Sequence, residues 1–209
     1  LILLDERLII KNLNFSFIEH PIDLRNFSYM FTILCILLLI NALNMFDGVN
    51  LQTGIYSIIV FIIFILKGIF VQLSLILIFI TLFFLYFNLK NKAFLGDSGT
   101  QLLAFLISYI FIKSYNYGNS FNPEEIFIIL AIPGLDMFRL FILRLINGKN
   151  PFHPDTNHIH HMLLNKFEKY YAVFLVQTFI IFNIIFYYYI EMKILSIIIT
   201  TILYIIFII

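Results

Sequence analysis

The sequence has few charged residues and a single cysteine, and it shows no signal peptide. Only 12% of its 209 residues are Asp, Glu, Lys or Arg, and the net charge is +1, so charge gives no argument for nucleic-acid binding. Cys35 lies inside an apolar run, where we expect it in the core or facing lipid; it says nothing about a redox compartment. The chain turns charged at Asp5 and Glu6 before a first apolar segment is complete, so we expect a fragment that begins at the end of a helix.

Apolar side chains, in contrast, are more abundant than a soluble core of this size could bury. Hydrophobic residues make up 62% of the chain and the mean hydropathy is +1.00. These values predict an all-α fold, namely a multi-pass integral membrane helix bundle in a single domain over residues 1–209.

About seven transmembrane helices are expected from the apolar runs. A membrane-spanning helix needs about 20 apolar residues, with about 17 as the usual lower limit, so the second and fourth runs need flanking residues. Pro133-Gly134 predicts a kink in the fifth run. The runs are Phe27–Leu43, Leu51–Leu66, Ile69–Phe87, Gln101–Ile112, Glu124–Leu145, Tyr170–Ile190 and Ile194–Ile209.

Three polar islands interrupt this apolar pattern. The first is NALNMFDGVN at residues 41–50, the second is LGDSGTQ at 95–101, and the third is NGKNPFHPDTNHIHH at 147–161. Polar groups at the edge of a hydrocarbon layer are costly unless they are paired, hydrated or bound to an ion, so these islands are candidate functional segments. For the first island, an exposed Asp47-Gly48 turn after a helix is the simpler alternative.

Counting the membrane crossings places all three islands on one side. That side also carries more Lys and Arg, which marks the cytoplasmic face. The preceding segment Leu8–Asn26 has short alternation, which predicts an extended or hairpin-like structure on the outer face, and its own basic residues weaken the charge count without reversing it. The island side carries Lys90, Lys92, Arg139, Arg144, Lys149, Lys166 and Lys169, and the opposite loops carry Lys67, Lys113 and Lys193.

The first two islands contain the oxygen ligands that a divalent cation prefers. Asn44 and Asp97 supply an amide and a carboxylate oxygen of the kind that Mg²⁺ accepts while it also binds water and phosphate. The turn Gly96–Gly99 could bring backbone N–H groups close to an anion at the start of the next helix. Asp97 could instead be a helix N-cap, and the two roles are compatible.

The third island, within an expected cytoplasmic loop at 144–168, holds four of the five histidines. His158, His160 and His161 could donate to phosphate, titrate near neutral pH or bind a metal, and Arg144 and Lys149 could pair with phosphate. A structural zinc site is one alternative, but no thiolate lies nearby and adjacent histidines on a helix project about 100° apart. A solvated loop without chemistry is another.

Asp136 and Arg139 lie one helical turn apart in the fifth run. This spacing predicts an ion pair that stabilises the end of the helix.

Together, the motifs NALNMFDGVN, FLGDSGT and PFHPDTNHIHH resemble the successive cytoplasmic motifs of the polyprenyl-phosphate N-acetylhexosamine-1-phosphate transferases. The NHIHH form is more similar to the WecA-type than to the MraY-type enzymes. The resemblance covers nearly the whole chain. It implies transfer of GlcNAc-1-phosphate or a related sugar phosphate from a UDP-N-acetylhexosamine to undecaprenyl phosphate, with release of UMP. It also implies a Mg²⁺ requirement, with Mn²⁺ as an alternative ion, and a multi-pass protein of the bacterial inner membrane, either monomeric or homodimeric.

The resemblance also implies roles for individual residues. Asn44 and Asp97 match the metal-binding pair. The resemblance also implies a catalytic role for Asp97, His158, His160 and His161. The residues matched to substrate binding are Asn41, Asp47, Asn50, Arg144, His158, His160 and His161.

Two departures from the family pattern stand out. Where the family usually has Asp-Gly-(Ile/Leu)-Asp-Gly, this chain has Asp47-Gly48-Val49-Asn50-Leu51, so an amide replaces the second carboxylate and the second glycine is lost. The upstream Asp-Asp pair of the family has no counterpart here, because Asp5-Glu6 falls on the wrong side of the membrane. We interpret its absence as truncation.

Two other function classes remain as alternatives. The His-rich cluster suggests a di-iron desaturase or hydroxylase, but that class needs several histidine boxes and only His20 lies outside this one. The other alternative is a non-enzymatic membrane protein or a catalytically incomplete remnant of the same fold. Mg²⁺-dependent release of UMP would separate the transferase from both.

Overall fold

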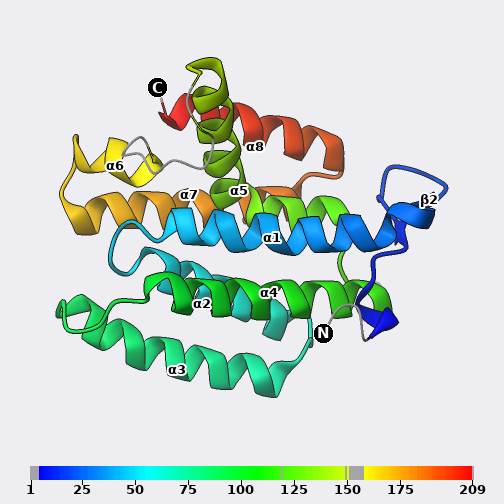
Figure 1. The fold of residues 1–209 in the computed structure, drawn as a ribbon, viewed down its shortest axis with the longest axis horizontal. Helices are drawn as coiled ribbons and strands as arrows, with labels where there is room; N and C mark the ends of the chain where they lie inside the picture. The colour runs from blue at the N-terminus through cyan, green and yellow to red at the C-terminus, as the bar shows by residue number, and fades with distance from the viewer. Residues whose placement is uncertain (1–4, 119, 149, 151–157, 209) are drawn as a thin grey trace.

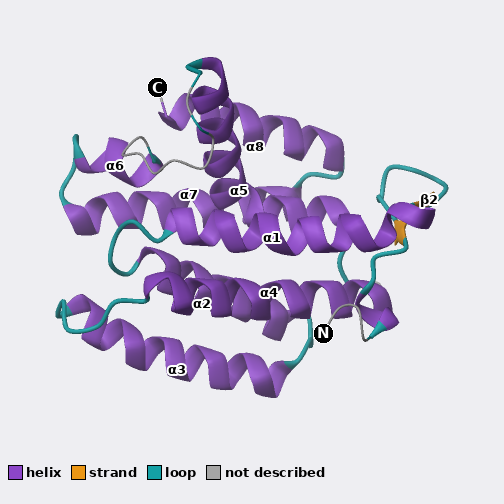
Figure 2. Ribbon diagram, in the orientation of Figure 1, coloured by secondary structure: helices purple, strands orange, loops and turns teal. Residues whose placement is uncertain are grey.

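The structure is a computed structural model that describes residues 5–118, 120–148, 150 and 158–208. Within these residues it is a bundle of seven helices of 15 residues or more, with one shorter helix and a single two-stranded sheet (Figure 1; Figure 2). The predicted all-α bundle is therefore confirmed. The helices are α1 (Ser28–Phe46), α2 (Gln52–Leu66), α3 (Val71–Leu89), α4 (Gly96–Gly118), α5 (Pro123–Ile146), α6 (Ile159–Leu164), α7 (Lys169–Tyr189) and α8 (Lys193–Ile208).

The helix bounds follow the predicted runs closely except in α4. The run Gln101–Ile112 is only the middle of a helix that begins at Gly96 and ends at Gly118. The prediction was too short because polar residues mark these ends. Inside the helix, hydroxyl groups bond back to the preceding turn, as in Ser108 to the Ala104 carbonyl at 2.8 Å and Ser114 to the Ile110 carbonyl at 2.6 Å. Such bonds satisfy a hydroxyl group without ending the helix.

Helix α5 continues through Pro133 but changes direction, as predicted. In Figure 1 its first half runs beside α1, and its second half turns away toward α8. Proline lacks an N–H group and its ring clashes with the preceding turn, which explains a bend at this point. The bend carries Asp136, three residues further on, away from α1's axis and toward α6 and α8.

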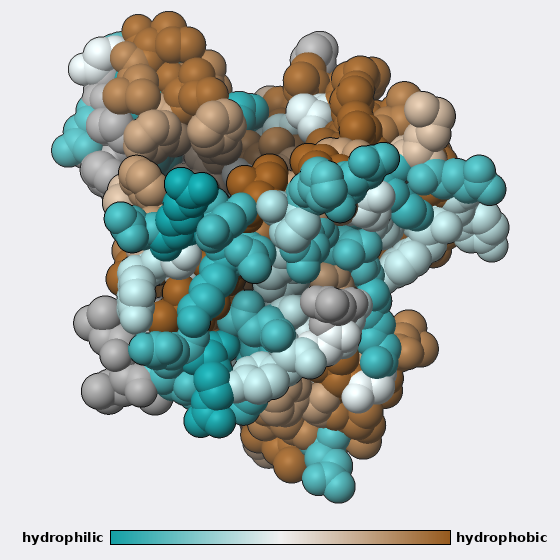
Figure 3. All heavy atoms as spheres, turned by 90° about the vertical axis from the view of Figure 1, so that its right-hand side faces the viewer, coloured by the Kyte–Doolittle hydropathy of each residue, from teal (hydrophilic) through white to brown (hydrophobic). Residues whose placement is uncertain are grey.

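The segment before α1 forms the predicted hairpin. Strand β1 (Asn12–Leu13) pairs antiparallel with β2 (Ile22–Asp23), between the short 3-10 helices η1 (Glu6–Leu8) and η2 (Arg25–Phe27). The hydroxyl of Tyr115, near the end of α4, accepts from the Asn14 N–H at 2.8 Å and donates to the Asn12 carbonyl at 2.7 Å. The hairpin therefore rests on the end of α4, and Figure 3 shows a hydrophilic surface at this end of the bundle with hydrophobic residues around it.

A buried ion pair lies at the same end as the hairpin. The ammonium group of Lys67, just after α2, is 2.6 Å from Glu125 Oε1 in the first turn of α5 and donates to the Ser120 carbonyl at 2.8 Å. Its Nζ atom also lies 4.4 Å from the centre of the Phe121 ring. The loops after α2 and α4 thus meet at one end, which agrees with the predicted alternation of crossings.

The outer faces of the helices are apolar. Among the described residues, four helices are long and apolar enough to cross a membrane: Arg25–Phe46, Val71–Leu89, Pro123–Ile146 and Lys169–Tyr189, whereas α2 and α8 are shorter. On α3, Phe79 and Phe83 are 73% and 63% exposed. Exposed apolar surface of this kind is typical of contact with lipid. The chain is therefore a membrane protein.

The core lies where α1, α2, α4, α5 and α7 meet. Aromatic rings fill its end near the ion pair: Phe111 lies 4.8 Å from Phe64 and 5.0 Å from Phe121, measured between ring centres. At the opposite end, Figure 1 shows the end of α1, the start of α4 and helix α6 together. These segments hold the first island's Asn44, the second island's Asp97 and the last residues of the third island, so the described parts of the islands meet at one end, as the crossing count predicts.

Candidate functional site

The first and second islands meet through a threonine hydroxyl. Asn44 lies in the last turn of α1, and its Oδ1 atom is 2.9 Å from the Thr100 hydroxyl on α4. The same hydroxyl lies 2.9 Å from the backbone carbonyl of Asp97. The Thr100 hydroxyl has a single proton, which it can donate to only one acceptor at a time. The amide oxygen of Asn44 therefore keeps lone pairs for another partner. Asn44 is therefore held beside the first turn of α4.

Asp47 and Asp97 bring two carboxyl groups to this place. Asp47 directly follows α1 and is partly buried; burial raises the pKa of Asp47 to about 6, the Thr53 hydroxyl lowers it, and the nearby charge of Asp97 raises it. Asp97 is exposed and is the second residue of α4. The N-cap alternative for Asp97 is therefore wrong, because the helix already begins at Gly96. In the first turn, a carboxylate interacts favourably with the helix dipole instead.

The third island packs directly on the first. A Cβ atom added to Gly48 would lie 1.8 Å from Nε2 of His160, so the imidazole ring occupies the space that a side chain would need. Only glycine permits this approach. Gly48 is exposed in a bend directly after α1, as the simpler alternative expected, but it is also a contact point between two islands.

His160 is buried, with 1% of its surface exposed, and neither ring nitrogen has a hydrogen-bond partner among the described residues. Burial, together with His161 and His158, lowers the pKa of His160 to about 3. Its ring is therefore neutral near pH 7. The expected cationic donor role does not fit His160 in this position, although a neutral imidazole can still donate one N–H group.

The three histidine rings form one cluster at the start of α6. The His158 and His160 rings are stacked, with centres 5.3 Å apart and planes 3° apart, and the centres of His160 and His161 are 4.4 Å apart. Among the described side chains, no three from His, Cys, Asp and Glu are placed to hold one metal ion. The cluster therefore does not form, with its described neighbours, the ligand set that a structural zinc site requires.

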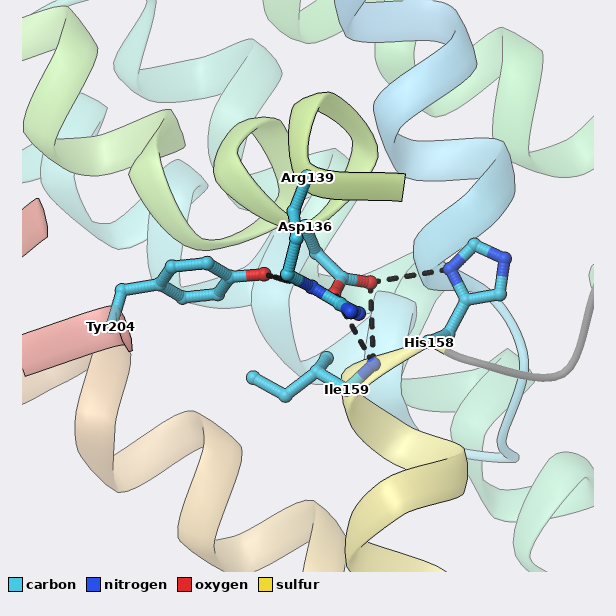
Figure 4. Close-up of polar contacts among 5 residues, drawn as sticks. All are labelled: Asp136, Arg139, His158, Ile159 and Tyr204. Carbon is cyan, nitrogen blue, oxygen red and sulfur yellow. Dashed lines mark hydrogen bonds and ion pairs between the residues drawn. The ribbon is translucent and has the colours of Figure 1, made fainter. Parts of the chain in front are cut away.

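Asp136, which the sequence predicted only as the partner of Arg139, also contacts His158. Figure 4 shows Asp136 on α5 with four partners. Three are donors to Oδ1: Arg139 Nη2 at 2.8 Å, the Tyr204 hydroxyl at 3.0 Å and the Ile159 N–H at 3.2 Å; the fourth is Nδ1 of His158, 3.2 Å from Oδ2. The predicted Asp136–Arg139 ion pair is present, but it lies in the middle of α5 and not at its end. The signal for a wider role was an acidic residue inside an apolar helix.

The remaining predicted residues have different surroundings. Arg144 is buried in the last turn of α5, so the expected loop 144–168 includes the end of α5 and the whole of α6. Asn41 is exposed on α1. Asn50 donates to the Asn88 carbonyl at 3.1 Å and to Asn91 Oδ1 at 2.7 Å, so its amide group is engaged with the loop between α3 and α4. Lys149, Pro151 and Pro154 lie outside the described residues.

The donor atoms at this end suit a hard divalent cation. Asn44, Asp47 and Asp97 offer an amide and two carboxyl groups, and oxygen ligands of these types are those preferred by Mg²⁺. The charge of Asp97 already disfavours ionisation of Asp47, and a cation between them would offset that repulsion. The residues present therefore fit the ion that the sequence motifs suggest.

Comparisons with known proteins agree with the motifs. The model of the family described as glycosyl transferase family 4 matches residues 1–115. Similar proteins include three bacterial proteins named undecaprenyl-phosphate alpha-N-acetylglucosaminyl 1-phosphate transferase. That from Pasteurella multocida is 38% identical over 94 residues, covering 44% of this chain and 26% of the relative. Those from Yersinia pestis and Escherichia coli K12 are 31% and 29% identical over 170 residues, covering 75% and 76% of this chain and 46% of each relative.

This chain therefore spans about half, or less, of the length of these relatives. No solved structure matches it.

Proposed function

The chain belongs to glycosyl transferase family 4, and we propose that the protein transfers GlcNAc-1-phosphate or a related N-acetylhexosamine-1-phosphate from a UDP-sugar to undecaprenyl phosphate. In this reaction, an oxygen of the lipid phosphate attacks the β-phosphorus of the UDP-sugar. A new P–O bond forms, the P–O bond to UMP breaks, and UMP leaves. The product would begin the synthesis of a polysaccharide or another cell-envelope glycan.

One observation carries this proposal: three polar segments far apart in the sequence meet at one end of a membrane bundle. Thr100 joins Asn44 to the start of α4, and His160 packs on Gly48. The site offers oxygen ligands from the first two segments and imidazole groups from the third. Such a combination is suited to phosphoryl transfer, which depends mainly on positioning and electrostatic stabilisation.

We assign metal binding to Asn44, Asp47 and Asp97. When bound, Mg²⁺, or Mn²⁺ in its place, would neutralise charge on the diphosphate. We assign His161 as a donor to phosphate oxygens and His158 as a residue that exchanges a proton with a phosphate group, and Arg144, in the last turn of α5, would add positive charge. Hydrogen bonds to a charged group contribute about 1.5–3 kcal/mol each.

We place this end of the bundle on the cytoplasmic face of the bacterial inner membrane. The support is the bias of Lys and Arg toward the loops of this end. Both substrates would then be reached from the inside, the nucleotide sugar from the cytoplasm and the lipid phosphate from the inner leaflet.

The test is UMP release by the full-length protein in membranes. We expect release that requires undecaprenyl phosphate, a UDP-N-acetylhexosamine and a divalent cation, and that stops on addition of EDTA. Asp97→Asn should lower the rate on the order of 10²-fold or more, because an amide keeps the shape of the side chain but not its charge. His158→Ala should also impair turnover without altering membrane insertion, since α6 is not one of the spanning helices.

Two results would contradict the proposal. Full-length protein that inserts into membranes but releases no UMP with any UDP-sugar would support a catalytically incomplete protein. Near wild-type turnover in Asp97→Asn membranes would remove Asp97 from the metal site.

A further inference from the structure

The carboxylate of Asp136 collects donors from three different elements. Asp136 itself and Arg139 belong to α5, the Ile159 N–H belongs to the first turn of α6, and the Tyr204 hydroxyl belongs to α8. Asp136 is 2% exposed, so these groups replace water as its hydrogen-bond partners. Buried carboxylates with several donors are fixed in orientation, since any rotation would break bonds that water cannot replace.

This environment determines which ring nitrogen of His158 carries the proton. Among the described residues, each hydrogen-bond partner of the Asp136 carboxylate other than His158 is a donor, so the carboxylate is the acceptor in each of these bonds. The His158 Nδ1 atom, 3.2 Å from Oδ2, makes a favourable contact only if it carries a hydrogen. In a neutral imidazole, the other nitrogen, Nε2, is then without a proton. Figure 4 shows Nε2 on the side of the ring that faces away from Asp136.

The position of the ring connects this tautomer to the site. His158 is stacked on His160, whose ring in turn contacts Gly48 beside Asp47. The same carboxylate binds the ring of His158 and the N–H of the next residue, so it fixes both the imidazole and the start of α6. A carboxylate that binds one nitrogen of an imidazole fixes the orientation of the ring, and it therefore also fixes the direction in which the other nitrogen points.

We propose that Asp136 is a positioning residue: it holds His158 in the tautomer protonated at Nδ1, so that Nε2 carries the lone pair and is the nitrogen that accepts a proton from a phosphate group at the site. Arg139 and Tyr204 hold the carboxylate in place from α5 and α8. Helix α8 therefore contributes to the orientation of a loop residue that lies 46 positions earlier, through the hydrogen bond from Tyr204. The role of Nε2 toward phosphate rests on the proposed function, whereas the tautomer does not.

The tautomer can be measured directly by ¹⁵N NMR of histidine-labelled full-length protein in bilayers. Spectra are recorded above the ordinary pKa of histidine, at about pH 8.5. Protonated and bare imidazole nitrogens have well-separated ¹⁵N shifts, and His158→Gln assigns the His158 signals by their loss. We expect a protonated Nδ1 and a bare Nε2. A protonated Nε2 in the wild-type protein would overturn the proposal.

Asp136→Asn provides the decisive variant. The amide oxygen can still accept from Arg139 and Tyr204, which leaves the amide N–H₂ group to face His158. The ring must then accept at Nδ1 and carry its proton on Nε2, so the two ¹⁵N signals should exchange their character. Glu124→Gln is the matched control, since Glu124 is also a fully buried carboxylate on α5 but accepts from Ser16 at the hairpin end. It should leave the His158 signals unchanged.

The activity of Asp136→Asn tests the consequence for the reaction. Loss of a correctly oriented acid or base typically lowers turnover by about 10²-fold or more, and we expect this fall in kcat with a much smaller change in KM for the UDP-sugar. Exchanged ¹⁵N signals with wild-type kcat would show that the tautomer is set by Asp136 but has no role in transfer, and would overturn the assignment of Nε2. If the wild-type protein has no transferase activity, the proposed function fails, and the NMR result still decides the tautomer.

Discussion

The carboxyl group of Asp47 shows how a single residue is shaped by the site around it. Its burial beside Asp97 favours the neutral form, and its pKa of about 6 lies well above the ordinary value of 3.8. Between these two pH values, the folded protein holds a proton that the unfolded chain has already lost. The contribution of Asp47 to stability is therefore greatest at about pH 4 or below, and it is lost as the pH rises to about 6.

Replacing Asp47 with Asn should remove this loss of stability with rising pH. In detergent with EDTA, we expect Asp47→Asn to raise the free energy of unfolding at about pH 7.5 by about 1–3 kcal/mol relative to wild type, and to have little effect at about pH 4. Thermal or denaturant unfolding at the two pH values gives the comparison. An equal gain at both pH values, or a loss at neutral pH, would show that repulsion and burial of this carboxylate are not the cause.

Gly48 is the residue on which the contact between the first and third islands depends. In Gly48→Ala, the new methyl group would lie 1.8 Å from Nε2 of His160, so the buried ring or the turn must move. Overpacking of this kind typically costs about 1–3 kcal/mol. We expect a loss of stability in this range, measured by unfolding in detergent, together with lower transferase activity.

Gly134 offers a matched control for this substitution. It is also a glycine of ordinary backbone conformation, and a Cβ atom there would meet nothing within 4 Å. Because alanine is favoured over glycine in a helix by up to about 1 kcal/mol, Gly134→Ala should be neutral or stabilising. If both variants lose the same stability, the His160 contact does not explain the requirement for glycine at position 48.

At the residue level, the sequence singled out Asn44 and Asp97 as oxygen ligands from their residue types. In the structure, the Thr100 hydroxyl contacts both the Asn44 side chain and the Asp97 backbone carbonyl, and the ligand role stays a prediction. The roles of Gly48 and Asp136 could not be predicted in the same way. Each depends on contact with a residue more than twenty positions away, which neither local pattern nor helical spacing reveals.

At the level of elements, one buried asparagine joins the loop after α1 to the loop after α3. Asn88 Oδ1 accepts from the Leu51 N–H at 2.7 Å, and its amide group donates to the Ala93 carbonyl at 2.7 Å. Leu51 has a φ of 76°, a left-handed conformation that favours glycine. The family pattern has glycine at this position, and here the bond from Asn88 holds a leucine in the same conformation.

Asn88→Leu should therefore destabilise the protein. It leaves the Leu51 N–H group and the Ala93 carbonyl without their partner, and a buried unsatisfied polar group costs about 1–3 kcal/mol. Asn183→Leu is the matched comparison: Asn183 is also buried, but its amide bonds only to the Phe179 carbonyl of its own helix and its Oδ1 atom has no partner among the described residues. Unfolding in detergent should show a clear loss for Asn88→Leu and a smaller or no loss for Asn183→Leu; the reverse order would contradict this role for Asn88.

Elements were predicted well wherever their ends coincide with a change from apolar to polar residues. This rule gave α1, α3, α5 and α7 within a few residues, and Pro133 gave the bend in α5. It failed for α4, whose first turn is the polar segment Gly96–Gly99. Since the helix includes these residues, Asp97 belongs to its first turn, and the site lies at the N-terminal end of a helix and not in a separate turn.

For the whole molecule, the main consequence is that both ends of the bundle are polar but built differently. The hairpin end holds the Lys67–Glu125 ion pair, with the fully buried Glu124 beside Glu125 in the sequence. The island end holds Asp47 and Asp97, whose charges disfavour each other. Crossing parity predicted which segments share an end, because short loops between spanning helices leave no other arrangement. It could not predict that Asp47 and Asp97 lie close enough for their charges to disfavour each other, since that depends on side-chain contacts between helices.

The neighbouring carboxylates Asp47 and Asp97 predict where a divalent cation binds, and Mn²⁺ is a suitable probe because it is paramagnetic and prefers the same oxygen ligands as Mg²⁺. In histidine-labelled full-length protein, we expect Mn²⁺ to broaden the ¹⁵N signals of His158 and His160, since the His160 ring contacts Gly48 beside Asp47. His20 is an internal control, because it lies in the segment before α1, at the opposite end of a helix about 28 Å long.

Asp97→Asn should abolish the broadening at equal Mn²⁺ concentration. It should also leave the unfolding temperature within a few degrees of wild type, because an exposed first-turn residue contributes little to stability. Broadening of His20 to the same extent as His158, or unchanged broadening in Asp97→Asn, would place the cation elsewhere and separate the second island from the metal site.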